Sequence, residues 1–292
     1  MPTMRALIRK RLLESKQVAD KLSSYCCRPA VFYQSAPDDK DEAWSQEAVY
    51  PYIILYADTR QEAEQGMAGQ LSVDIVCNET GVMPEVIEPV VKESLTNVFF
   101  TADGQDPAVL VWKESQVFKE QVSDKQSMLV GITMLFDIHD FPDMETGDPD
   151  PVAAFNDYAE EWDKDVAVIG RSEIEPIFNP SRARPAFYFR QANTSIDRQT
   201  NTVVWVNTAV SGHFFAPTLH DRNMWIDQFV QSLALAGEIE MPDGSPMFIR
   251  NIRGNSGNDG LTGQIQIEAQ YGILRRPKYA HPMTGSLWEV NK

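Results

Sequence analysis

The residues best suited to metal chemistry are Asp137, His139, Asp140 and Asp143, which lie in one short segment. Asp137 and His139 are two positions apart, so on a strand their side chains would point to the same side. Carboxylates and an imidazole could ligate Mg²⁺ or Mn²⁺ in a hydrolase. No second histidine or glutamate cluster completes the ligand set, so we expect a polar strand end without a metal or catalytic residues. A metal-dependent hydrolase using Asp137 and His139 is kept as the alternative from another class.

Other candidate motifs favour structural roles. His213 and His220 flank a strand-to-helix junction, and we expect one in the strand and one in the first helical turn, near Asp221. The segment Gly254 to Gly260 lacks the Lys-Ser or Lys-Thr of a phosphate loop and precedes a strand-like run, so we expect a hairpin tip. The sequence shows no Ser-His-Asp elbow, zinc-ligand pattern or dinucleotide fingerprint. We therefore expect neither enzymatic activity nor a cofactor.

Charge and composition exclude several classes of protein. The chain has 292 residues, a hydrophobic fraction of 43% and a net charge of −16. This acidity argues against general binding of nucleic acid or of anionic membranes, which needs clustered Lys and Arg. No apolar run approaches the roughly 20 residues of a membrane span, and Met1 to Lys16 lacks the features of a secretory signal. Three cysteines give no disulfide framework, which is typical of a protein assembled in a reducing cytoplasm.

The elements that must position these residues alternate between helices and strands. Hydrophobic stripes predict four helices, which contain Met4–Leu22, Ile87–Val98, Val152–Ile169 and Trp225–Ala236. Prolines at 84 or 89 and at 149 and 151, and the capping-box spacing of Thr218 and Asp221, mark helix starts. Period-two patterns and apolar runs predict the strands 29–34, 51–57, 70–77, 109–122, 126–138, 184–190, 202–216, 247–253 and 261–273. The stretch 193–201 is expected to be a polar turn.

The order of elements repeats in the two halves. Each half contains a helix, two strand regions, a second helix and two final strands. Arg184-Pro185-Ala186 also matches Arg28-Pro29-Ala30 at an offset of 156 positions. We therefore predict an internal duplication, with two unrelated α+β domains as the alternative. The expected fold class is α/β (α+β), with two similar domains, each a mixed β-sheet with flanking helices. The predicted boundaries are 1–143, 144–276 and a C-terminal arm, 277–292.

The first half resembles a known protein family. A basic amphipathic helix leads into Pro29-Ala30-Val31-Phe32-Tyr33-Gln34, and a polar loop then precedes Tyr50-Pro51-Tyr52-Ile53-Ile54-Leu55. A strand with Asp74, a helix and two strands follow. This pattern is similar to that of the tail-terminator or tail-completion proteins of tailed bacteriophages and related contractile particles. It covers about half the chain directly and the second half only through the repeat.

The resemblance implies a structural virion protein of the tail or neck, assembled in the host cytoplasm. Members of the family have no catalytic residues and form a ring, usually six-fold, that caps the tail tube and receives the head connector. This chain is about twice the length usual in the family. The expected ring is therefore either a trimer with pseudo-six-fold symmetry or a hexamer. Its partners would be the tail tube protein and head–tail connector or neck proteins, with the genome passing through the lumen unbound.

Interface residues are expected in two segments. Trp44 lies in the acidic loop Ala36 to Ala48, where an exposed indole would be unfavourable, so we expect it to contact a neighbour; folding back onto its own domain is the alternative. The proline-broken, basic C-terminal segment is expected to form an arm onto a neighbour, through Arg275, Arg276 and Tyr279. Another neck or head–tail joining protein is the alternative function within the class, and a cytosolic binding module is a third possibility.

Overall fold

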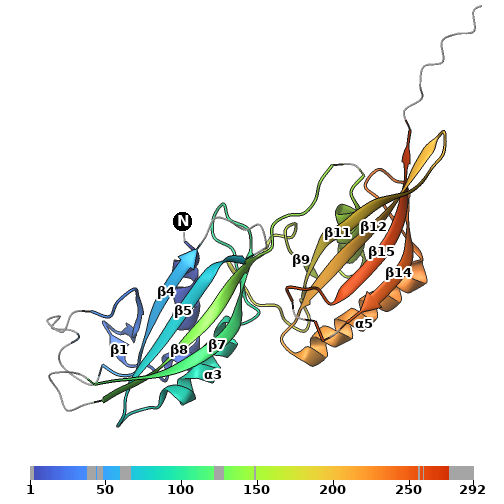
Figure 1. Ribbon diagram of the computed structural model, residues 1–292. Helices are drawn as coiled ribbons and strands as arrows, with labels where there is room; N and C mark the ends of the chain where they lie inside the picture. Colours follow the sequence, from blue (N-terminus) through green and yellow to red (C-terminus); the bar gives the residue numbers. More distant parts are fainter. Residues whose placement is uncertain are drawn as a thin grey trace, which may run out of the picture.

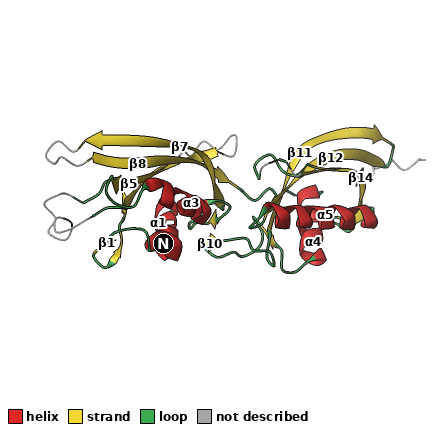
Figure 2. Ribbon diagram, turned by 90° about the horizontal axis from the view of Figure 1, so that it is seen from below, coloured by secondary structure: helices red, strands yellow, loops and turns green. Residues whose placement is uncertain are grey.

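The computed structural model describes residues 3–37, 44, 49–59, 67–121, 128–147, 149–255, 257–258 and 260–275. The fold is mixed α/β, as the sequence predicts. Two large sheets lie beside one another along the chain, the first built mainly from the N-terminal half and the second from the C-terminal half (Figure 1). The described helices all lie on one side of the two sheets (Figure 2), so the opposite side of each sheet is not covered by a helix.

The first sheet has the strand order β10-β6-β7-β8-β5-β4-β3. Its pairs are antiparallel except β3 with β4, which are parallel. Helices α1 and α3 supply the apolar side chains that cover it, among them Leu7, Ile8 and Val91. The elements of this half are α1 (Met4–Glu14), α2 (Lys16–Ala19), β1 (Ser24–Tyr25), β2 (Arg28–Pro29), β3 (Val31–Tyr33), β4 (Tyr52–Thr59), β5 (Met67–Asn78), α3 (Pro84–Leu95), β6 (Phe99–Phe100), β7 (Ala108–Gln121) and β8 (Met128–Asp140).

The second sheet has the strand order β13-β14-β15-β12-β11-β9. Here too all pairs are antiparallel except one, β9 with β11. Helices α4 and α5 cover one side, with Phe155 and Phe229 at the centre of the core. The elements are α4 (Pro151–Trp162), β9 (Ala167–Val168), β10 (Ile177–Phe178), β11 (Ala186–Gln199), β12 (Val203–Phe215), α5 (Leu219–Ala236), β13 (Glu238–Glu240), β14 (Pro246–Gly254) and β15 (Ile265–Leu274).

The two sheets share one topology. The order β6-β7-β8-β5-β4-β3 in the first sheet corresponds, strand for strand along the chain, to the order β13-β14-β15-β12-β11-β9 in the second. The single parallel pair lies at the same edge of both. In each half a residue in the left-handed conformation also lies between a helix and the short strand that follows it, Asn97 at φ 60° between α3 and β6 and Gly237 at φ 71° between α5 and β13. This agreement in strand order is what an internal duplication predicts.

The sequence offset of 156 positions is nevertheless wrong as a guide to equivalent strands. Arg28-Pro29-Ala30 leads into β3, the edge strand parallel to β4. Arg184-Pro185-Ala186 leads into β11, whose counterpart in the first sheet is β4, because β9 takes the place of β3. The two Arg-Pro-Ala segments therefore begin different strands, and their likeness reflects only a proline placed before a strand start.

Several predicted boundaries also change. The first helix breaks at Ser15, so Val18 rather than Ala19 is buried behind the break. Helix α4 ends at Trp162, and Val166 and Ile169 are buried outside it. The predicted polar turn 193–201 is instead mostly strand, because β11 runs on to Gln199 paired with β12. That extension is exposed, so it lacks the apolar pattern by which a strand is recognised.

The second half also contributes a strand to the first sheet. Strand β10 pairs antiparallel with β6, and the Thr101 amide donates to the Pro176 carbonyl at 2.9 Å. A separate apolar cluster joins the two sheets and consists of Phe99, Val109, Phe141, Ala167, Ile169, Phe178, Ala186, Tyr188 and Phe215. The predicted boundary between two domains, at residues 143 and 144, thus lies in a segment that has contacts between the halves on both sides. The division into two domains stays a prediction.

Candidate functional site

The residues of the alternative metal-site hypothesis do not form a ligand group in the described part of the chain. Asp137 and His139 do lie on the same side of β8, as their spacing predicts, because each is on the helix-free side of the strand. Asp137 accepts a hydrogen bond from Gln70 Nε2 at 2.9 Å and lies 3.7 Å from Lys113 Nζ, so its charge is already balanced within the sheet. Asp140 and Asp143 follow at the strand end. Across the residues that the structure describes, no three His, Cys, Asp or Glu side chains group as metal ligands would.

The two histidines have different surroundings. His213 is buried on β12, with its Nδ1 atom 2.6 Å from the Gly260 carbonyl oxygen. His220 is exposed in the first turn of α5, where the Thr218 hydroxyl accepts from the Asp221 amide and caps the helix. Both histidines therefore lie where the sequence predicts. Gly254 to Gly260 begins at the end of β14 and lies before β15, which also agrees with a hairpin connection.

Trp44, which we expected at an interface, is buried within its own chain, and its place at an interface stays a prediction. Its side chain is only 5% exposed, and it packs edge to face on Phe32, Tyr52 and Tyr25 of its own chain. The indole is therefore already removed from water without a neighbour, as the alternative reading requires. Arg275 is exposed beyond β15 and donates to the Gln199 side chain. Arg276, Tyr279 and the rest of the predicted arm lie outside the described residues.

The most extensive candidate surface is formed by the helix-free sides of the two sheets. On the first sheet we call this side open face 1. It carries, from β4, β5, β7 and β8, the side chains Tyr52, Ile54, Tyr56, Asp58, Gln70, Ser72, Asp74, Glu114, Gln116, Phe118, Glu120, Thr133, Leu135, Asp137 and His139. The alternation of strand side chains places them opposite the buried set that contains Ile53, Val73 and Ile132.

On the second sheet the corresponding side is open face 2, which is rich in amides and arginine. It carries Arg190, Asn193, Ser195, Asp197, Arg198, Trp205, Asn207, Ala209, Ser211, Phe248, Arg250, Asn251, Arg253, Gln266, Glu268 and Gln270. Gln270 Nε2 donates to Asn207 Oδ1 at 2.9 Å and to Asp197 Oδ2 at 3.1 Å, and Arg250 donates to Gln270 Oε1. This network spans four strands and fixes the polar side chains in position.

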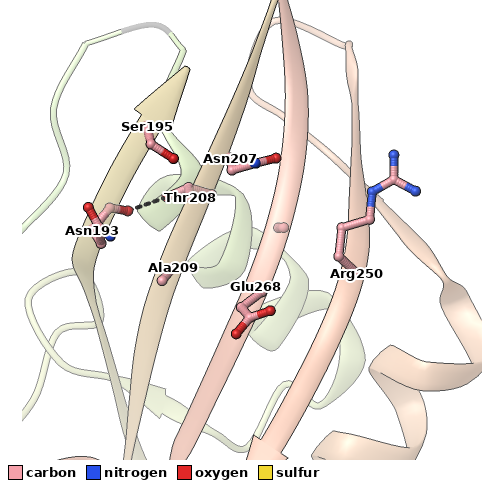
Figure 3. A pocket seen from close by; sticks show the side chains of 8 residues that line it. Asn193, Ser195, Asn207, Thr208, Ala209, Arg250 and Glu268 are labelled. Atoms are coloured by element: carbon pink, nitrogen blue, oxygen red, sulfur yellow. Dashed lines mark hydrogen bonds between the residues drawn. The ribbon is translucent and has the colours of Figure 1, made fainter. Parts of the chain in front are cut away.

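A hollow of about 360 Å³ lies on open face 2. Figure 3 shows Asn193 and Ser195 on β11, Asn207 and Ala209 on β12 and Glu268 on the neighbouring strand, arranged around the short Ala209 side chain. Arg250 also lines the hollow, from β14, the strand beyond that of Glu268. The hollow exists because alanine is flanked by longer side chains. Its lining offers hydrogen-bond donors and acceptors together, so it suits a side chain or small group with a polar tip.

Comparison with known proteins adds no identification. No protein-family model matches the sequence, and no curated protein matches it significantly. Within the described chain, no helix has the length and apolar character needed to cross a membrane.

Sequence reasoning missed the open faces because the residues that form each one come from four strands, and only the register brings them together. The period-two pattern of 70–77 shows which residues of that strand share a side, but it does not show which strands lie beside it.

Proposed function

We propose that the protein is a structural component of a phage or phage-derived tail, a tail-terminator-like subunit that assembles into a ring. The observation that carries the proposal is the repeated strand order of the two sheets, with the parallel pair at the same edge of each. A chain built of two like units supplies two positions of a ring, so three chains would complete a pseudo-six-fold ring; six chains would make a wider or double-layered one.

The distribution of polar and apolar groups is compatible with this role. The described helices cover one side of each sheet, which leaves much of the other side, away from the Trp44 cluster on Tyr52, available for contacts in an assembly. The net charge of −16 suits a lumen that does not retain the phosphate backbone of a passing genome. The proposed partners are the tail tube protein on one side and head–tail connector or neck proteins on the other, with the virion tail or neck as the location.

Native mass spectrometry and negative-stain imaging of the purified full chain test the proposal. A closed ring with a central opening and a mass of three or six chains is the expected result. A strictly monomeric protein at tens of micromolar, or an open filament, would contradict it. Attachment of the ring to the ends of purified tail tubes would then separate a tail terminator from another neck protein.

A further inference from the structure

The two open faces differ in charge. Among the described residues of open face 1, the acidic side chains Asp58, Asp74, Glu114, Glu120 and Asp137 outnumber the basic side chains Lys113 and His139. On the inner strands of open face 2, by contrast, basic side chains outnumber acidic ones. The basic set is Arg190, Arg198, Arg250 and Arg253, and the acidic set is Asp197 and Glu268. Edge strand β13 adds Glu238 and Glu240, so the arginine surplus is confined to the strands inside it. In a chain of net charge −16, these arginines form a local region complementary to open face 1.

The arginines of open face 2 are held in place. The Arg198 guanidinium lies 5.3 Å from the centre of the Trp205 ring, and that of Arg250 lies 5.6 Å from the centre of Phe248. The two rings are themselves neighbours, with centroids 6.4 Å apart. Arginines fixed on half-buried aromatic rings lose little further conformational freedom on binding, which favours them as contact residues.

The two faces also differ in shape. Tyr56 on β4 is 55% exposed and stands on open face 1, in register with Ser72, Leu135 and Glu114 across the sheet. Open face 2 has its hollow of about 360 Å³ around Ala209. A tyrosine ring is apolar with a hydroxyl at its tip, and the amides of Asn193 and Asn207 with the Ser195 hydroxyl can pair with that hydroxyl.

We propose that open face 2 of one copy docks on open face 1 of a second copy, with Tyr56 seated in the hollow around Ala209. Arg198 and Arg250 then face Asp74 and Glu114. This contact rests on the self-assembly proposed above and names its surface. It joins unlike patches. Made once with each neighbour it is heterologous and can close a ring, and made reciprocally between two copies it forms a two-fold, isologous pair.

The size of the faces suits such a contact. Four strands spaced about 4.8 Å apart, each with about eight residues at 3.3 Å, give roughly 500 Å² of flat area on one face. A stable protein contact buries about 800 Å² on each partner. The area that one face pair can bury therefore lies at the low end of the range for protein contacts. Both faces of a copy lie on the same side of the molecule, so two copies that make the contact reciprocally bury both face pairs in one interface, which then reaches the usual range.

Single substitutions test the fit of Tyr56 in the hollow. Tyr56→Ala removes the projecting ring, and Ala209→Leu fills the hollow; each is expected to raise the dissociation constant for self-association at least ten-fold. Leu235→Ala is the matched control, because Leu235 is 89% exposed on α5, on the helix side. It should leave the dissociation constant unchanged. Sedimentation velocity over a concentration series measures all three, with circular dichroism confirming the fold.

Charge reversal tests which faces meet. The double variant Arg198→Glu/Arg250→Glu and the double variant Asp74→Lys/Glu114→Lys should each lose self-association. Mixed in equal amounts, they should form a complex that contains both, because the reversed faces are complementary again. Failure of the mixture to associate, when both variants are folded and each alone is monomeric, would overturn the proposed pairing of faces.

The outcomes separate this inference from the proposed function. Wild-type rings that survive Tyr56→Ala and both charge reversals would overturn the inference and leave the ring intact. A wild-type pair that never forms a ring, yet dissociates with these variants, would support the docking and contradict the ring. A wild-type protein that stays monomeric would contradict both.

Discussion

The rings of Phe99 and Phe215 meet edge to face, with centroids 4.9 Å apart and planes at 81°. Phe99 belongs to β6 of the first sheet and Phe215 ends β12 in the second, so this contact joins the two sheets. Phe141, from the segment between the halves, packs edge to face on both rings. Phe99 has no exposed surface and Phe215 very little. The joint is therefore a small hydrophobic core in its own right.

Phe99→Ala should weaken this joint. Removing a fully buried phenylalanine typically lowers the free energy of unfolding by about 3–5 kcal/mol. Urea unfolding followed by circular dichroism measures the loss. Leu235→Ala, a change at the surface of α5, should shift the same free energy by less than about 0.5 kcal/mol. A Phe99→Ala protein as stable as the wild type would show that the cluster does not couple the sheets.

Asp140, at the end of β8, should make stability depend on pH. Burial and then the nearby Asp106 raise the pKa of Asp140 to about 6. Between the ordinary aspartate pKa near 3.8 and this value, the folded state binds more protons than the unfolded state. The free energy of unfolding attributable to this group should therefore fall as pH rises from about 4 to 6 and stay low above that.

The matched variant for Asp140 is Asp140→Asn, which cannot ionise. Its free energy of unfolding should exceed that of the wild type at pH 7.5, and the difference should shrink toward pH 4.5. Asp106→Asn should lower the pKa of Asp140 observed by NMR titration, because it removes the repelling carboxylate. An unchanged gap between wild type and Asp140→Asn across this range would contradict the prediction.

Trp44→Ala is now expected to act on the fold first. The indole is 5% exposed among Phe32, Tyr52 and Tyr25, so its loss should lower the free energy of unfolding by about 3 kcal/mol. Trp44→Phe keeps an aromatic ring and should recover part of that stability. A Trp44→Ala protein with full stability that nevertheless fails to form rings would instead assign Trp44 to the interface, as the sequence first suggested.

Gly131→Ala should be destabilising despite the small size of alanine. A Cβ atom at this position would lie 2.2 Å from the Phe118 ring and 2.6 Å from the Ile75 carbonyl oxygen. Because the second atom belongs to the backbone of the adjacent strand, side-chain movement alone cannot relieve the clash. We expect a loss of about 1–3 kcal/mol in the free energy of unfolding. Adding Phe118→Ala should relieve only part of it, which thermal unfolding of the double variant can measure.

Local sequence signals predicted most of the individual elements. Thr218 and Asp221 fix the start of α5, and the stripe from Trp225 through Phe229 to Leu233 fixes its buried side. Alternating residues in 70–77 correctly placed Leu71, Val73 and Ile75 in the core. These features depend on neighbours a few residues apart, so the sequence alone carries them.

Only the tertiary structure decided how those elements combine. The short strands β6, β9, β10 and β13 have too few residues to show a period, and each is defined by the edge with which it pairs. The pairing of Ile177 and Phe178 with Phe99 and Phe100 across the two halves has no local signal, nor has the burial of Trp44. The same holds for the open faces, where strand register places Tyr56, Asp74 and Glu114 on one side of the first sheet. Contacts between distant segments depend on which edge and which side of a sheet remain available after the local elements have formed, and that is a property of the whole fold.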